Sequence, residues 1–201
     1  GGAGNDTLIG GEGGDTLTGG PGDDTYILTE FDGALAAASS SGYAQSGIVE
    51  DDVFLQGRYL SLGISGSGSF GTATSAPSGM YSSARYGNKV GMAVDQDGLN
   101  EGDPSTTGDF FLPGSPEEGF TVGYKTDGVA STFSNVERNW TTQITKQTVQ
   151  NLSSGDTLSA RWVGVTGSDG NKMKVTQVIS FQEQSKSFLN TITLTNNSSN
   201  T

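Results

Sequence analysis

The sequence predicts an all-β protein in two parts, and three observations favour this fold class. A nonapeptide returns three times in residues 1–27, and each copy carries an apolar residue at the same position. Several later segments alternate apolar and polar residues, which is the period of a strand with one buried face. Helical periodicity is almost absent from the chain. We therefore expect a repeat unit over residues 1–30, a connector over 31–51 and an antiparallel β-sandwich over 52–201.

The repeated nonapeptide has the form G-G-x-G-x-D-x-U-x, where U is apolar, and its copies are GGAGNDTLI, GGEGGDTLT and GGPGDDTYI. Glycine permits positive φ angles and close backbone approach, so the start of each copy can form a tight turn whose carbonyl oxygens point toward one place. The apolar residue, which is Leu8, Leu17 or Tyr26, then points inward from a short strand. A flexible glycine-rich linker, the alternative, does not require aspartate and an apolar residue to keep one phase.

A hard cation is the ligand that suits such turns, because they offer only oxygen atoms. Calcium accepts about six to eight oxygen ligands in an irregular shell, whereas magnesium demands a near-ideal octahedron. We therefore expect Ca²⁺ as the cofactor. The candidate metal-binding residues are the aspartate and the second and third motif glycines of each copy: Asp6, Asp15, Asp24, Gly2, Gly4, Gly11, Gly13, Gly20 and Gly22.

This pattern closely resembles the RTX, or haemolysin-type, calcium-binding repeat. The match covers all three aspartates and all nine motif glycines, which are Gly1, Gly2, Gly4, Gly10, Gly11, Gly13, Gly19, Gly20 and Gly22. The resemblance implies a parallel β-roll in which one coil takes two nonapeptides and each ion lies between a turn and the turn two repeats later. It thereby places Asp6 and Asp24 around one ion, whereas Asp15 needs a partner outside these copies.

The same resemblance implies a bacterial protein that leaves the cell through a type I secretion channel as an unfolded chain and folds on meeting calcium outside. The net charge of −12 keeps a calcium-free chain expanded, and the absence of cysteine avoids premature cross-links. We expect a secreted, extracellular protein of the bacterial cell surface with an adhesin-like role. The alternative is the non-catalytic part of a secreted calcium-dependent hydrolase that acts on polysaccharide or protein.

The composition excludes several other classes of protein. Ten lysine and arginine residues against 22 acidic ones argue against nucleic acid as a partner, because phosphate binding requires clustered basic side chains. The chain has no cysteine and no histidine, which removes the common zinc sites, the usual catalytic triads and the commonest general base. No apolar run is long enough to predict a membrane span.

The second part is expected to be a β-sandwich because apolar residues alternate along several segments. Leu60, Leu62 and Ile64 indicate a half-buried strand. Residues 157–182 indicate two strands joined through the turn-forming residues 167–171, and a further strand follows. The apolar residues expected on one face of each later strand are Met173, Val175, Ile179 and Phe181, and then Phe188, Ile192 and Leu194.

The stretches FLQGRYLSLGISGSGSFGT and DFFLPGSPEEGF also resemble, more loosely, β-sandwich modules of large secreted bacterial surface proteins. The sequence stops directly after its last expected strand, and no later strand returns to pair with it. We therefore expect a truncated sandwich that is incomplete at its C-terminus.

Two further patterns suggest ligand sites and have simpler explanations. The segment GSGSFG at residues 66–71 matches the glycine spacing of dinucleotide-binding loops, but no helix is predicted after it to support a phosphate. An acidic segment at 95–109 could hold a second, irregular calcium ion, although its spacing does not fit a regular calcium loop and a solvated loop is favoured. Its polar residues are Asp95, Asp97, Asn100, Glu101, Asp103 and Asp109.

Catalysis is not expected from this chain. Glu117 and Glu118 lie near Glu101 and Asp109 in the sequence, but a glycosidase needs two carboxyl groups at a defined separation with different pKa values. No serine-hydrolase elbow or zinc-protease motif occurs. Carbohydrate or another cell-surface ligand remains a partner to consider, because aromatic rings could stack on sugars, although burial in the core is favoured for the tryptophans. The aromatic residues concerned are Tyr81, Tyr86, Trp140 and Trp162.

Overall fold

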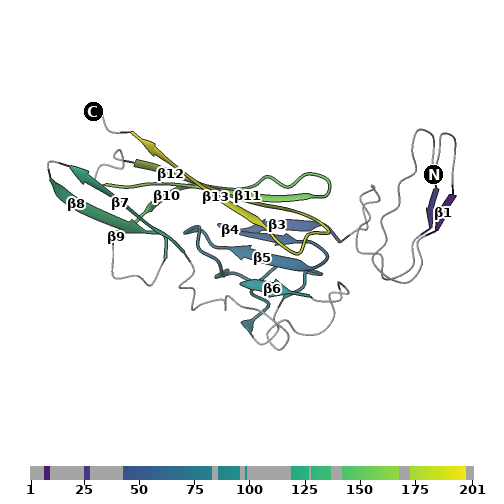
Figure 1. Cartoon of the computed structure of the whole chain (residues 1–201). Coiled ribbons are helices and arrows are strands. Elements are labelled where there is room, and N and C mark those ends of the chain that lie inside the picture. Colours follow the sequence, from purple (N-terminus) through teal and green to yellow (C-terminus); the bar gives the residue numbers. More distant parts are fainter. Residues whose placement is uncertain are drawn as a thin grey trace. The chain divides into compact units, whose positions relative to one another are not determined.

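A computed structural model of the chain describes residues 7–9, 25–27, 43–82, 86–95, 98, 119–126, 128–136, 142–167 and 173–197. Within these ranges the regular elements are the strands β1 to β13, and no α-helix occurs there, which confirms the predicted fold class. The chain forms two compact units, Gly1–Ser39 and Ser40–Thr201. Strands β1 and β2 belong to the first unit, and β3 to β13 belong to the second (Figure 1).

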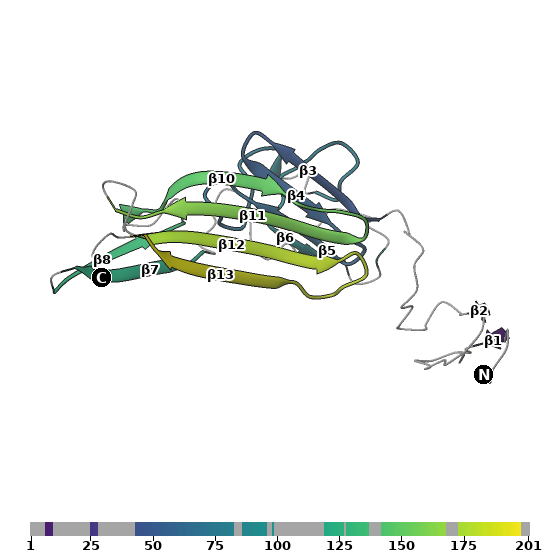
Figure 2. The same ribbon diagram turned by 90° about the horizontal axis from the view of Figure 1, so that it is seen from above.

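The second unit contains three sheets. One antiparallel sheet has the order β3-β4-β5-β6, formed by Gln45–Val49, Asp52–Gln56, Leu60–Ile64 and Met92–Val94. A second antiparallel sheet has the order β10-β11-β12-β13, formed by Thr145–Asn151, Thr157–Val165, Met173–Gln182 and Leu189–Asn196. The small sheet β7-β8-β9 comprises Thr121–Thr126, Val129–Ser134 and Thr142–Gln143, and its last two strands are parallel. The two larger sheets are the layers of a β-sandwich (Figure 2).

Apolar side chains from both layers form the sandwich core. Strands β4 and β5 contribute Val53, Leu55, Leu60, Leu62 and Ile64, and the facing strands β11 and β12 contribute Leu158, Ala160, Ile179 and Phe181. Burial of a side chain such as leucine or phenylalanine contributes about 1.5–3 kcal/mol relative to exposure. This cluster is therefore the main source of stability for the larger unit.

The predicted pair of strands at 157–182 is present as β11 and β12, which pair in antiparallel from Thr157 opposite Gln182 to Val165 opposite Lys174. The four apolar residues expected on one face of β12 are all buried: Met173, Val175, Ile179 and Phe181. Strict alternation of apolar and polar residues thus places the core face of this strand correctly. The predicted turn residues 168–171 lie outside the described residues.

Strand β5 is buried on both faces, whereas its sequence predicts a half-buried strand. The reason is the chain that follows it. A Cβ atom on Gly63 would lie 2.2 Å from the Val90 carbonyl oxygen and 2.6 Å from the Thr72 side chain. The backbone around Thr72 and Val90 therefore covers the face of β5 that points away from the second layer.

The sandwich also begins earlier than the boundary expected at residue 52. Strand β3 lies within the expected connector at 31–51, and it pairs with β4 from Gln45 opposite Gln56 to Val49 opposite Asp52. The sequence of β3, QSGIV, contains one serine, one glycine and few apolar residues, so alternation gives almost no signal there.

A buried carboxylate fixes the long connection that follows β5. Asp52 is 3% exposed. Its Oδ1 atom accepts a hydrogen bond from the Gly66 amide at 3.1 Å, and its Oδ2 atom accepts from the Ala73 and Thr74 amides at 2.7 Å each. The Thr74 hydroxyl donates a further bond of 2.8 Å to Oδ2. One side chain thus holds two separate parts of this connection against β4.

We expect Asp52→Asn to lower the free energy of unfolding of the larger unit by about 2–4 kcal/mol, because an amide NH₂ group would face backbone N–H donors inside the protein. Urea unfolding of the full chain measures the change. The matched control is Asp51→Asn at the neighbouring position. Asp51 makes one ion pair, with Lys146, between side chains that are 58% and 36% exposed, so its loss should cost less than about 1 kcal/mol. Equal losses in the two variants would contradict the role given to Asp52.

Trp162 on β11 is the centre of a second apolar cluster, which joins the small sheet to the sandwich. The other buried members are Val122, Phe133, Ile144, Met173 and Val175. The indole Nε1 donates a hydrogen bond of 3.1 Å to the Gly66 carbonyl oxygen, and Phe120 meets the indole edge-on at a centroid distance of 6.2 Å. Residues 66–71, which match the dinucleotide glycine spacing, therefore form a turn that packs on Trp162. The described residues after this turn, 72–82, are not helical.

Gly68 should be the most sensitive position of this turn. Its φ angle is +83°, and a Cβ atom there would lie 2.7 Å from the indole ring. Gly79 has a similar φ angle of +89° with open space around the added atom. We expect Gly79→Ala to cost about 1–2 kcal/mol through backbone strain alone, and Gly68→Ala to cost a further 1–3 kcal/mol, roughly, through overpacking. Thermal unfolding of both variants tests this, and similar losses would show that the ring can move aside.

Candidate metal site

The repeat unit contains two short strands that lie side by side. Strand β1 (Thr7–Ile9) pairs in parallel with β2 (Thr25–Ile27), and the partners are Thr7 with Thr25, Leu8 with Tyr26 and Ile9 with Ile27. Each residue thus lies beside the residue 18 positions further along the chain, which is two nonapeptides (Figure 1). This register agrees with the two-repeat coil that the resemblance implies.

The paired strands fix the frame of the candidate ligands. In the sequence, Asp6 directly precedes Thr7, and Asp24 directly precedes Thr25. These aspartates therefore hold equivalent positions before two strands that are in register. The predicted metal-binding residues themselves lie outside the described residues, and their assignment stays a prediction: Asp6, Asp15, Asp24, Gly2, Gly4, Gly11, Gly13, Gly20 and Gly22.

The donor atoms of the repeat fit calcium. Each copy supplies backbone carbonyl groups and an aspartate carboxylate, and the whole chain contains no imidazole or thiolate that could select a softer metal. Carbonyl and carboxylate oxygens are the ligands from which calcium sites are built. The residues present are thus consistent with a calcium ion held by turns of the repeat.

The second acidic segment is described only in small part. Asp95, which directly follows β6, is buried, and its backbone amide donates a hydrogen bond of 3.0 Å to the carbonyl oxygen of Tyr59, just before β5. Among the described residues, no group of three or more acidic, histidine or cysteine side chains could hold a metal ion. The other polar candidates of this segment, and the two glutamates considered for catalysis, lie outside the described residues: Asp97, Asn100, Glu101, Asp103 and Asp109, and Glu117 and Glu118.

Two of the four aromatic residues considered for sugar stacking belong to the interior. Trp162 is 1% exposed and Tyr81 is 7% exposed, so neither ring offers a face to a ligand. Tyr86 is half-buried, and Trp140 lies outside the described residues. The core explanation is therefore correct for Trp162, and the carbohydrate explanation fails for both buried rings.

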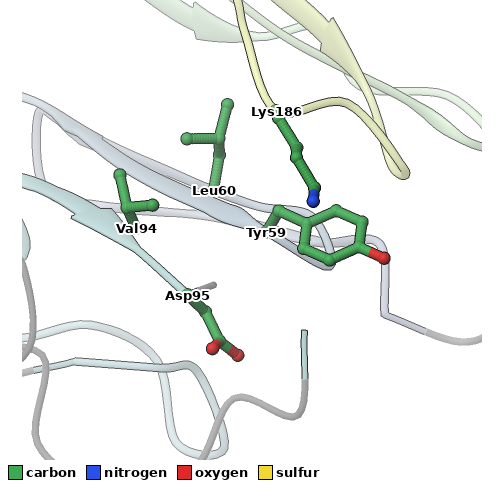
Figure 3. A pocket seen from close by; sticks show the side chains of 5 residues that line it. All are labelled: Tyr59, Leu60, Val94, Asp95 and Lys186. Carbon is green, nitrogen blue, oxygen red and sulfur yellow. The ribbon is translucent and has the colours of Figure 1, made fainter. Parts of the chain in front are cut away.

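One small cavity in the larger unit has a volume of about 140 Å³ and is lined by Tyr59, Leu60, Val94, Asp95 and Lys186 (Figure 3). The Lys186 ammonium lies 4.6 Å from the centre of the Tyr59 ring. The Arg58 guanidinium lies 5.6 Å from the same ring and 5.5 Å from the Tyr43 ring. These contacts are cation–π interactions near the start of the unit, and two of the residues involved, Tyr59 and Lys186, also line the cavity.

Sequence reasoning missed this cluster of cations and rings. The pair Arg58 and Tyr59 is adjacent in the chain, but Tyr43 and Lys186 reach it from distant segments. Glu183 joins them, because its side chain accepts a hydrogen bond of 2.9 Å from the Tyr43 amide and its carbonyl accepts one of 2.8 Å from the Arg58 amide. Contacts between residues so far apart in the chain leave no local sequence pattern from which they could be predicted.

Comparison with known proteins identifies the first unit alone. A family described as the RTX calcium-binding nonapeptide repeat (4 copies) matches residues 1–30, which confirms the resemblance inferred from the motif. The repeats thus indicate calcium binding. Neither the curated proteins nor the solved structures give a match to the chain. Within the described residues, no helix has the length and hydrophobicity needed to cross a membrane.

Proposed function

We propose that this chain is part of a secreted bacterial protein that acts at the cell surface in an adhesin-like role, with calcium bound by its repeats. The observation that supports the calcium function is the parallel pairing of β1 with β2 at a spacing of two nonapeptides, in a segment that matches the calcium-binding repeat. We include export by type I secretion and a surface location in the proposal because proteins that carry such repeats are generally secreted bacterial proteins.

One ion belongs, in this proposal, to the turns of the first and third copies, between Asp6 and Asp24. Each of these aspartates directly precedes one member of the aligned pair Thr7 and Thr25. Neighbouring strands lie about 4.8 Å apart, so the turns before them can share one ion through carboxylate and carbonyl oxygens. Asp15 belongs to the intervening copy, and its turn requires a partner outside these three copies.

The charge of the chain makes calcium a folding ligand. Twelve excess negative charges oppose compaction, and a divalent cation bound between two aspartates removes part of that repulsion. Extracellular calcium modules have dissociation constants of about 10⁻⁴ to 10⁻³ M, whereas intracellular sensors respond at about 10⁻⁷ to 10⁻⁵ M. A site of the former affinity stays empty inside the cell and fills outside, which suits a protein exported as an unfolded chain.

The larger unit serves as the structural or adhesive module. Its two four-stranded sheets enclose an apolar core to which both layers contribute side chains, so we assign it the role of a structural body that accompanies the repeats. We assign no catalytic role to this chain. A carbohydrate or another cell-surface molecule is the ligand class that an adhesin-like role requires.

Calorimetric titration of the full chain with CaCl₂ tests the proposal. We expect Asp24→Asn to weaken calcium binding by about tenfold or more, because it removes a charged ligand from the shared site. Asp15→Asn should have a smaller effect, since Asp15 lacks a second complete turn. Asp156→Asn is the charge-matched control, because Asp156 is exposed in the turn before β11, far from the repeats in the sequence. Equal losses for Asp15→Asn and Asp24→Asn would refute the pairing, and no calcium heat at all would refute the function.

The hydrolase alternative gives a separate test. We expect no turnover of polysaccharide or peptide substrates by the purified chain. Activity that disappears in Glu117→Gln or Glu118→Gln would favour the secreted hydrolase instead. Urea unfolding of these two variants, whose substitutions lie in the unit Ser40–Thr201, keeps a loss of folding apart from a loss of catalysis.

A further inference from the structure

Strand β13 forms one edge of the β10-β11-β12-β13 sheet and is unusually open. It pairs with β12 over its whole length, and no strand of the described residues pairs with its other side. All eight of its side chains are exposed. They include three large apolar ones, Leu189 at 65%, Ile192 at 39% and Leu194 at 51%.

Two of these apolar side chains lie on the core face of the sheet. Ile192 is opposite Gln177 on β12, and Leu194 is opposite Val175. Opposite residues of an antiparallel pair point to the same face, and both Gln177 and Val175 are buried. The apolar face of the sheet therefore continues onto β13, where its side chains remain accessible to solvent. The sequence correctly places Ile192 and Leu194 on one face of the strand, but these side chains are exposed in the structure.

Two other edges of the sandwich, β10 and β6, carry features that oppose pairing with another chain. Strand β10, at the opposite edge of the same sheet, has an irregular register between Lys146 and Thr148, and Lys146 forms an ion pair with Asp51. Strand β6 contains only three residues. Bulges, lysines and short strands are the usual protections of an edge. Strand β13 has none of them, because it is eight residues long, uncharged and regularly paired.

The order of residues in β13 is nearly symmetric. From Asn190 to Asn196 it reads N-T-I-T-L-T-N, which is the same in both directions except that isoleucine exchanges with leucine. Two such strands that pair in antiparallel about Thr193 would place each residue opposite its own kind. The opposed residues would be Thr193 with Thr193, Ile192 with Leu194, Thr191 with Thr195 and Asn190 with Asn196. A second copy of this chain thus fits the edge better than an arbitrary partner does.

We propose that the chain forms a two-fold symmetric dimer through β13. The two-fold axis passes through Thr193 perpendicular to the sheet, so the core faces of the two copies lie on the same side. The β10-β11-β12-β13 sheet of one copy then joins the same sheet of the other copy, and together they form one continuous sheet of eight strands. On its core face Ile192 of each copy packs against Leu194 of the other, which removes apolar surface from water at both positions.

The charge distribution permits this pairing. Two chains with a net charge of −12 repel each other, but β13 itself contains no charged residue, so no like charges stand opposite each other in the joined edge. The proposal concerns the larger unit and does not depend on calcium binding by the repeats.

Sedimentation of the full chain over a range of concentrations tests the dimer. We expect a monomer–dimer equilibrium in the wild-type chain. Thr193→Lys and Thr193→Glu each place like charges opposite each other on the axis, so each should weaken the dimer about fivefold or more. A mixture of the two variants should associate again, because lysine then faces glutamate. Thr148→Lys, an exposed threonine on the edge strand β10, is the matched control and should leave the dimer unchanged.

A cysteine test checks the register independently, because the chain has no cysteine of its own. Thr193→Cys should form a disulfide-linked dimer under mild oxidation, since the two thiols face each other on the axis. Thr191→Cys should cross-link far more slowly, because each thiol then faces Thr195 of the other copy. A wild-type monomer at the highest soluble concentration would overturn the proposal. So would dimers that persist in Thr193→Lys, or equal cross-linking at the two positions, because both outcomes place the contact elsewhere.

Discussion

The packing of Trp162 is the contact on which the larger unit most depends. The indole projects from β11. It packs against the Gly66–Gly68 turn, to which it donates a hydrogen bond, and against the ring of Phe120, which directly precedes β7 of the small sheet. A Cβ atom on Gly164 would also approach the ring to 2.3 Å. Three segments that are distant in the sequence thus meet at one buried side chain. Glycines surround it because any larger residue there would push the segments apart.

The two units obtain their stability in different ways. The larger unit relies on apolar burial and on polar groups that find partners inside the protein, as Asp52 does with the connection after β5. The repeat unit is rich in glycine and aspartate, and in the function proposed above a bound calcium ion offsets part of its negative charge. If the proposed site is correct, a change in calcium concentration acts on the repeat unit and leaves the apolar core of the larger unit intact.

Sequence patterns predict the regular parts of this structure well and the irregular parts poorly. The hairpin of β11 and β12 follows from strict alternation, and the position of its core face follows from the same pattern. Strand β3 and the sheet β7-β8-β9 were not predicted, because their segments are rich in serine, threonine and glycine. The few apolar residues in and beside the small sheet, such as Val122, Phe133 and Ile144, pack against residues that are distant in the sequence. Alternation also shows which face of a strand is apolar, but not whether another layer covers it, and β13 is the example.

The predictability of the candidate metal site has a different origin. The ligand type follows from the chemistry of the nonapeptide, whereas the pairing of alternate copies came from the resemblance and has its physical counterpart in the register of β1 and β2. That register has a consequence for how such a tract can grow. If an ion sits between copies that are two apart, the first two copies supply no complete site, and every additional copy adds one. The number of calcium ions bound then rises by one with each added copy. Gain or loss of a single nonapeptide would therefore change, in a small step, the calcium concentration at which the repeat unit folds.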